Sequence, residues 1–145
     1  VYFTEHGGPE VLQYGDLPEP VPNENEVKIK VRACALNRLD VYTRAGVRGT
    51  KMDLQEPHVL GADVSGEIVD VGSNVTKVLV GDRVVVNPRI TCMQCSHCQS
   101  NQSEYCDKAG MVGSATRGGY AEFAVVPAYS AFPIPTSLRP IASRR

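Results

Sequence analysis

Four of the five cysteines of this chain fall in one short stretch with the spacing Cys-x2-Cys-x2-Cys-x7-Cys; they are Cys92, Cys95, Cys98 and Cys106. Two interpretations compete: four thiolates around one Zn²⁺, or disulfides of a small secreted scaffold. Three thiols this close suit a metal better than bridges, because one ion accepts several ligands from a single tight turn. The stretch therefore predicts a zinc site. His97 lies inside it, but with four cysteines present we expect a solvated loop histidine.

A closed four-cysteine site has no open position for a substrate, so this zinc is expected to be structural. The residues between the ligands are polar and offer little to bury, and metal binding would supply the ordering free energy of a lobe over about 88–111. The functional centre must lie elsewhere.

Composition limits the partners and the compartment. A length of 145 residues suits one domain, and a formal net charge of −1 argues against a nucleic-acid surface. No apolar run approaches the ~20 residues needed to span a bilayer, so we expect no membrane partner. Without a recognisable signal peptide, a reducing cytoplasmic location is expected. Cys34, outside the cluster, is expected to be a small core or half-buried residue.

Short valine-rich runs separated by 13 glycines and 10 prolines predict a mainly β domain. Residues 26–35 give the clearest strand, because apolar and mostly charged residues alternate with a period of two. Residues 37–45 predict a short helix with Gly46 as its C-cap. Residues 2–4 and 11–17 predict an N-terminal pair of strands. The remaining predicted strands lie within 59–72, 84–86, 120–126 and 131–135.

Four blocks resemble the catalytic domain of the zinc-type medium-chain dehydrogenases and reductases, the alcohol dehydrogenase and quinone reductase superfamily. The run 61–72 resembles the family's Gly-His-Glu-x-x-Gly-x-Val-x-x-Val-Gly, and Gly81-Asp82-Arg83-Val84 matches its Gly-Asp-x-Val turn. The cysteines have the spacing of its structural zinc lobe, and Gly119-Tyr120-Ala121-Glu122-Phe123 matches its return strand. The blocks are in the right order and cover most of the chain.

The resemblance implies a GroES-like fold over residues 1–145, a partly open β-barrel with short helices and the inserted zinc lobe. It also implies a Rossmann domain that binds most of NAD(P)H. No Gly-x-Gly-x-x-Gly between a strand and a helix occurs here, so that domain is expected to be absent from this chain. A full-length protein is expected to be a homo-oligomer, and the fragment alone to be inactive.

The departures from the family pattern carry the functional prediction. Asn37 stands where an alcohol dehydrogenase has its first catalytic-zinc cysteine, Leu39 replaces the proton-relay hydroxyl, and Ala62 replaces the zinc-binding histidine. Asp63 replaces the neighbouring glutamate, whereas Asp40 keeps an aspartate that supports the site. Alanine cannot bind zinc and an amide is a poor ligand. The structural zinc is therefore expected and the catalytic zinc is not.

Without a Lewis acid, reduction of a quinone or an α,β-unsaturated carbonyl is easier than oxidation of a simple alcohol. Asparagine at the zinc-cysteine position resembles the quinone oxidoreductase branch. That resemblance implies a catalytic set of Asn37, Asp40 and Tyr42, with Arg38 near the cofactor pyrophosphate. Each has a simpler structural alternative: Asn37 as a helix cap, Arg38 in solvent, and Tyr42 packed against the core.

Two other functions stay open. The first is a zinc-dependent alcohol dehydrogenase with atypical ligands, which metal content would distinguish. The second is a non-catalytic, zinc-stapled binding module that never meets a nucleotide.

Overall fold

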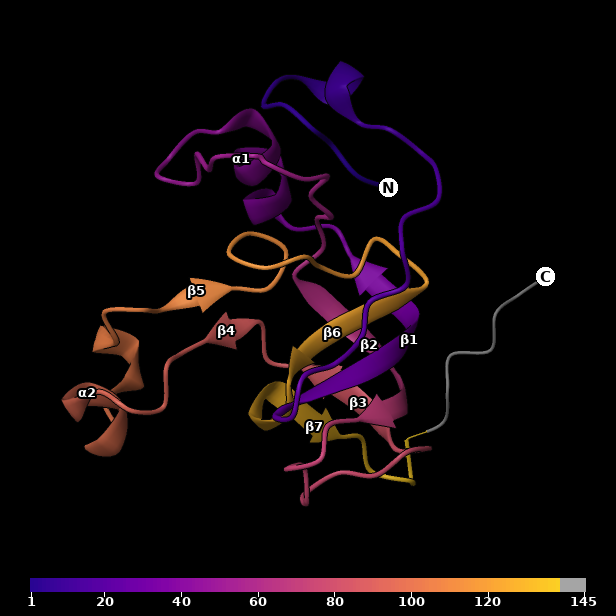
Figure 1. Cartoon of the computed structure of the whole chain (residues 1–145), viewed down its shortest axis with the longest axis vertical. Coiled ribbons are helices and arrows are strands. Elements are labelled where there is room, and N and C mark those ends of the chain that lie inside the picture. Colours follow the sequence, from indigo (N-terminus) through magenta and orange to yellow (C-terminus); the bar gives the residue numbers. More distant parts are fainter. Residues whose placement is uncertain (139–145) are drawn as a thin grey trace.

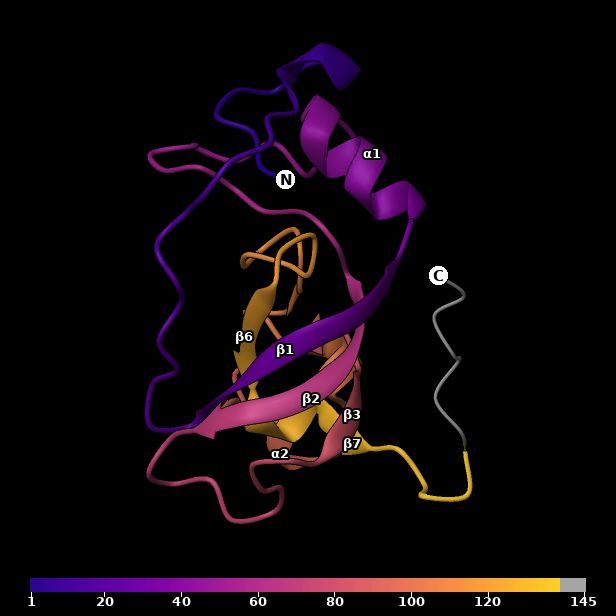
Figure 2. The same cartoon turned by 90° about the vertical axis from the view of Figure 1, so that its right-hand side faces the viewer.

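A curved antiparallel sheet of five strands forms the centre of the domain (Figures 1 and 2). The computed structural model describes residues 1–138. The strands are ordered β6-β1-β2-β3-β7 across the sheet, so neighbours in space are not always neighbours in sequence. Their bounds are β1 Glu26–Ala35, β2 Asp63–Val71, β3 Arg83–Val86, β6 Phe123–Pro127 and β7 Ala131–Pro133. The mainly β fold with short helices that the sequence predicts is confirmed.

The core lies on one face of this sheet and consists mostly of β-branched side chains. Val27, Ile29, Ile68, Val84 and Val126 are fully buried and belong to one apolar cluster. Each comes from a strand in which buried and more exposed residues alternate. Burial of such side chains on a pleated surface is the main favourable contribution to folding of a domain like this one.

Strand β1 has the predicted bounds, but the buried and exposed positions exchange places along the strand. Val27 and Ile29 are buried as expected, whereas Ala33 and Ala35 are exposed and Cys34 is half-buried. The pairing with β2 shifts register between Val31 and Ala33, which marks a β-bulge. One extra residue in a strand reverses the faces of all those that follow. The alternation predicted from the sequence therefore matches the burial only in the first half of β1.

Helix α1 (Arg38–Ala45) follows β1 and begins and ends where the sequence predicts. Its N-cap Asn37 and Asp40 form a capping box. The Asn37 side chain accepts a hydrogen bond from the backbone of the first turn, and the Asp40 carboxylate accepts one from the N–H of Asn37. Gly46 ends the helix with φ 67°, and a Cβ there would lie 2.8 Å from the His6 ring. Both features favour glycine at this position.

The N-terminal segment forms less regular structure than expected. Of the predicted strands, only single bridges form, Tyr2 with Gln13 and Phe3 with His58, and a 3-10 turn η1 (Pro9–Val11) interrupts them. Pro18, Pro20 and Pro22 then lack the N–H groups that a strand needs. This segment runs along the outside of the sheet domain as an extended wrap (Figure 2).

A lobe projects sideways from the sheet (Figure 1). Its base is the two-stranded sheet of β4 (Arg89–Ile90) and β5 (Gly110–Met111), and its tip contains α2 (Ser96–Gln99) and the 3-10 turn η2 (Ser103–Tyr105). A further 3-10 turn, η3 (Ala128–Ser130), joins β6 to β7. Among the helices of residues 1–138, none combines the length and apolar character needed to cross a membrane.

Candidate functional site

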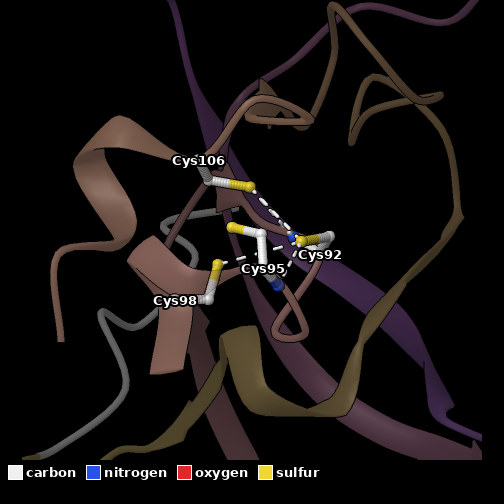
Figure 3. Close-up of side chains that lie close together, drawn as sticks. All are labelled: Cys92, Cys95, Cys98 and Cys106. Carbon is white, nitrogen blue, oxygen red and sulfur yellow. Dashed lines mark hydrogen bonds between the residues drawn. The ribbon is translucent and has the colours of Figure 1, made fainter. Parts of the chain in front are cut away.

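The sulfur atoms of Cys92, Cys95, Cys98 and Cys106 converge at the tip of the lobe (Figure 3). All four lie within 4.8 Å of one another. The Sγ atom of Cys92 is 3.9 Å from that of Cys98 and 3.6 Å from that of Cys106. A tetrahedral Zn²⁺ with Zn–S bonds of about 2.3 Å requires sulfur–sulfur distances of about 3.8 Å. The predicted ligands therefore form a donor set that fits zinc.

Backbone N–H groups donate hydrogen bonds to two of these sulfurs. The N–H of Cys95 donates to Sγ of Cys92 at 3.3 Å, and the N–H of Cys92 donates to Sγ of Cys106 at 3.4 Å. The backbone N–H of Gln94, and then that of Cys95, lower the pKa of Cys92 to about 6, while burial and the neighbouring thiols raise the pKa of Cys98 to about 11. A bound cation would lower the pKa of all four thiols, because it stabilises each sulfur as a thiolate.

His97 lies on α2 beside these ligands but outside the cluster. Its ring centroid is 6.0 Å from that of Tyr105, and the four sulfurs already complete a tetrahedron. The sequence predicts a solvated loop histidine, whereas His97 is half-buried and lies in a short helix beside Tyr105.

Two side chains hold the lobe in place. The Tyr129 hydroxyl donates to the carbonyl of Thr91 and accepts from its N–H, both at 2.9 Å. Nη2 of Arg89 donates to the carbonyl of Glu104 at 2.6 Å. Thr91 precedes the first ligand and Glu104 comes shortly before the last one. Hydrogen bonds therefore tie both ends of the metal loop to neighbouring residues.

A second polar cluster lies where β1, α1 and the start of β2 meet. Its centre is Asp40, only 5% exposed. Oδ2 of Asp40 accepts from the N–H of Asn37 at 2.8 Å and from the Tyr120 hydroxyl at 2.7 Å, and Oδ1 accepts from the N–H of Gly61 at 3.0 Å. With three donors on a buried carboxylate, Asp40 orders the backbone on both sides of the site. Burial, then the bond to Asp40, raises the pKa of Tyr120 far above its ordinary value.

The amide of Asn37 is held in one orientation by two bonds. Its Oδ1 accepts from the N–H of Leu39 at 3.0 Å, as a helix cap does, and its Nδ2 donates to Oδ2 of Asp63 at 2.8 Å. The opposite orientation would set an oxygen against the Asp63 carboxylate. One N–H of Asn37 remains available to another partner. The structural alternative for Asn37 is therefore present, and it leaves a donor free.

The other predicted site residues lie on α1 and its C-terminal turn. Arg38 is exposed at the first helical position, and Tyr42 is half-buried one turn later on the same face. The guanidinium carbon of Arg48 lies 4.9 Å from the centroid of the Tyr42 ring. Bonds bring Asn37 together with Asp40 and Asp63 but join neither Arg38 nor Tyr42 to them.

A groove of about 660 Å³ borders this cluster and is lined mainly by apolar side chains, among them Leu36 and Val41. Cys34, Asn37 and Tyr120 also line it. Burial, together with the negative charges of Asp40 and Asp63, raises the pKa of the Cys34 thiol to about 11. Cys34 is thus half-buried, as expected, and is a poor nucleophile at neutral pH.

The residues that the family resemblance places at catalytic-zinc positions offer few metal-donor atoms. Ala62 is 1% exposed and has no donor atom, and Asn37 turns an N–H rather than a lone pair toward Asp63. Within residues 1–138, the four-cysteine cluster is the one group of three or more histidine, cysteine or acidic side chains arranged around a common point.

Comparison with protein families matches residues 23–136 to the alcohol dehydrogenase GroES-like domain. The chain belongs to this family. The GroES-like fold expected from the four sequence blocks is thereby confirmed, and with it the relation to the medium-chain dehydrogenases and reductases.

Relatives of this GroES-like domain are dehydrogenases and reductases. L-Threonine 3-dehydrogenase of Shewanella baltica is 32% identical over 85% of this chain and 36% of its own length. A crystal structure of an NAD-dependent alcohol dehydrogenase has 42% identity and a TM-score of 0.88, covering 96% of this chain and 40% of that one.

Two further solved structures are informative. A cobalt- and zinc-bound thermostable alcohol dehydrogenase from Pyrobaculum aerophilum has 35% identity and a TM-score of 0.82, over 91% of this chain and 40% of that one. A crotonyl-CoA carboxylase/reductase has 27% identity and a TM-score of 0.84, over 92% and 32%. The GroES-like domain thus spans about a third to two fifths of these proteins.

Sequence reasoning missed two residues of the site. The sequence predicts Tyr120 only as part of a return strand, although its hydroxyl reaches Asp40 across 80 positions. It predicts no role for Arg48, whose guanidinium carbon lies 4.9 Å from the centroid of the Tyr42 ring. For Arg48 a local signal exists, because the following Gly49 marks a tight turn.

Proposed function

We propose that this chain is the N-terminal catalytic domain of a longer NAD(P)H-dependent reductase of quinones or α,β-unsaturated carbonyls, with a structural zinc and no catalytic zinc. The observation that carries the proposal is the 2.8 Å hydrogen bond from the Asn37 amide to Asp63. At this position a zinc-dependent alcohol dehydrogenase would need two metal ligands facing one ion. Here the amide N–H of Asn37 faces the carboxylate of Asp63, and the neighbouring Ala62 is apolar.

The donors that remain suit stabilisation of an oxyanion. When NAD(P)H is bound, its reduced nicotinamide supplies the hydride that a conjugated carbonyl accepts. Negative charge then collects on the substrate oxygen, where one or two hydrogen-bond donors stabilise it. The free N–H of Asn37 and the hydroxyl of Tyr42 are the proposed donors. Asp40 fixes Asn37 through its backbone N–H, and Arg38, exposed at the start of α1, is the proposed contact for the cofactor pyrophosphate.

The donor set supports a structural role for the zinc. Four sulfurs leave no position for a substrate or a water. The ion would order the polar lobe and keep it attached through Thr91 and Tyr129. We further propose a cytoplasmic, homo-oligomeric full-length protein, which completes the cofactor site with a Rossmann domain.

Relatives support two substrate classes. The crotonyl-CoA carboxylase/reductase is named for the reduction of an unsaturated thioester and favours the enone assignment. The L-threonine 3-dehydrogenase and the NAD-dependent alcohol dehydrogenase favour oxidation of a hydroxyl. The second candidate is therefore an alcohol dehydrogenase whose zinc ligands differ from the usual ones.

Metal content and substrate range of the longer protein separate the two candidates. The reductase should hold one zinc per chain, oxidise NAD(P)H with a quinone or an enone, and leave primary alcohols unchanged. The alcohol dehydrogenase should hold two zinc ions and lose activity with alcohols after mild chelation. Anomalous scattering at the zinc edge with a second peak near Asp63 would refute the proposal.

A further inference from the structure

The turn that follows α1 has an unusual residue at its centre. The N–H of Thr50 donates to the carbonyl of Val47 at 3.2 Å and closes a four-residue turn. Its two central residues both have positive φ, 56° at Arg48 and 79° at Gly49. Turns of this kind favour Asn-Gly or Gly-Gly, because residues with a Cβ rarely adopt a left-handed backbone. Arginine at the first central position is therefore strained.

The surrounding contacts keep the turn in this conformation. The Thr50 hydroxyl lies 2.8 Å from the carbonyl of Tyr42 and 2.6 Å from that of Val47, and the N–H of Val47 donates to the Tyr42 carbonyl at 3.1 Å. Packing does not explain this conformation, because nothing lies within 4 Å of a Cβ built on Gly49. Strain that the surroundings maintain is a feature of functional sites.

The strained backbone places a guanidinium over the Tyr42 ring, 4.9 Å from its centroid. Five of the arginines in residues 1–138 donate a hydrogen bond to a carboxylate or a carbonyl; they are Arg32, Arg44, Arg83, Arg89 and Arg117. In the same part of the chain Arg48 makes neither a hydrogen bond nor an ion pair, and it is exposed. A guanidinium that lies over a ring in a cation–π contact still has N–H groups that can bind a ligand.

We propose that Arg48 binds a carboxylate of the substrate, so that the carbonyl compound reduced at this site is an oxo acid, saturated or unsaturated. The inference rests on the proposed function, in which the Tyr42 hydroxyl donates to the carbonyl oxygen. Because Arg48 lies on the Tyr42 ring, the carboxylate and the carbonyl belong to one small molecule. A guanidinium edge and a carboxylate match as two parallel hydrogen bonds.

The cofactor phosphates are the less suitable ligand for Arg48. The positive end of the α1 dipole lies beside Arg38, which starts the helix, and favours phosphate there.

Binding by this chain tests the proposal without any turnover. The probes are 4-oxopentanoate and its methyl ester, which share one skeleton and differ by the carboxylate charge. The Arg48 Nε–H and Tyr42 ring resonances are followed by NMR in the zinc-loaded chain. Arg48→Asn removes the guanidinium and keeps a residue that this turn favours. Arg117→Gln removes an exposed arginine that does not line the groove and serves as the control.

We expect the acid to shift both resonances saturably, the ester to leave them unchanged, and Arg48→Asn to abolish the shift of Tyr42. Arg117→Gln should bind as the wild type does. Equal shifts with acid and ester, or binding retained in Arg48→Asn, would overturn the proposal. Inorganic phosphate that competes at a tenfold lower concentration than the acid would overturn the carboxylate assignment in favour of a phosphate.

Kinetics in the longer protein supply the second arm, with 4-oxopent-2-enoate and its methyl ester as substrates. Arg48→Asn should raise KM for the acid about ten- to a hundredfold and leave the ester, kcat and the KM for NAD(P)H nearly unchanged. A rise in the KM for NAD(P)H instead would contradict the substrate role. If neither compound is reduced, the proposed function fails, while the NMR arm still decides whether Arg48 binds a carboxylate.

Discussion

The hydroxyl of Tyr120 donates to Oδ2 of Asp40 at 2.7 Å, and this bond joins the return segment of the sheet to helix α1. The same carboxylate holds the N–H groups of Asn37 and Gly61. Tyr120 therefore both borders the groove and acts on the site through Asp40. Its effect passes through a buried carboxylate that fixes the starts of α1 and β2.

Tyr120→Phe should destabilise the domain by about 1–3 kcal/mol, because a buried carboxylate oxygen loses a donor while the ring stays in place. Urea unfolding measures this free energy. Tyr14→Phe is the control, since Tyr14 is 94% exposed and should change stability by a few tenths of a kcal/mol at most. An equal loss in both variants would show that the bond to Asp40 contributes nothing.

Cys34 should react slowly with iodoacetamide in the folded, zinc-loaded chain. Its pKa is raised from 9.0 to about 11, so the thiolate fraction at pH 8.5 falls roughly fifty- to a hundredfold relative to the unfolded chain. Mass spectrometry after timed alkylation gives both rates. Equal rates would contradict the raised pKa.

The same shift has a consequence for stability against pH. Because the folded thiol holds its proton more tightly than the unfolded one, its contribution is fully present below about pH 9 and is lost as the pH rises through about 11. Cys34→Ala should flatten the decline of stability in that window. A decline of unchanged slope would assign it to other groups.

Cys95→Ser should release the zinc and loosen residues of about 88–111 while the sheet stays folded. Metal analysis after dialysis and hydrogen exchange by region measure the two effects. Cys34→Ser, outside the cluster, should keep the ion. A full equivalent of zinc in Cys95→Ser would contradict the four-sulfur assignment.

Tyr129→Phe should loosen the lobe without releasing its metal. The hydroxyl satisfies both backbone groups of Thr91, and its loss should cost about 0.5–1.5 kcal/mol because water reaches this partly exposed site. Exchange of the Thr91 amide should accelerate, and the zinc content should stay at one equivalent. Unchanged exchange at Thr91 would remove Tyr129 as the anchor.

Asn37→Ser and Tyr42→Phe should each lower turnover of the longer protein with quinones or enones. Loss of one oxyanion donor typically costs about 2.7–4 kcal/mol, or a factor of 10²–10³ in rate. Serine keeps the helix cap, so a loss of activity at normal stability isolates the amide donor. Full activity in both variants would assign the oxyanion to backbone or cofactor groups.

Much of the fold could be predicted because its signals are local. The alternation in residues 26–35 gave β1 its bounds, and Asn37, Asp40 and Gly46 contain the cap signals that begin and end α1. The zinc cluster was predictable for the same reason. Four cysteines a few residues apart restrict the chain to few geometries, and one ion satisfies them all.

The remaining features depend on the register between strands, which a pattern of neighbouring residues in the sequence does not reveal. A single extra residue near Arg32 reverses the second half of β1 and turns Cys34 toward the groove. The bond between Tyr120 and Asp40, and that between Asn37 and Asp63, join the start of α1 to the segment before β6 and to β2. The relative placement of these elements is set by that bulge and by the sheet order. Such pairs are visible only once the strands are placed.

The lobe leaves and rejoins the sheet domain at one point. Arg89 pairs with Met111, and the N–H of Val112 donates to the carbonyl of Pro88 at 2.8 Å. An insertion whose two ends already meet can be gained or lost as one unit. Replacing residues 91–109 by a two-residue hairpin turn such as Asn-Gly would join β4 directly to β5. The product would be a metal-free domain with the same sheet, which makes the zinc lobe a site for grafting other loops in protein engineering.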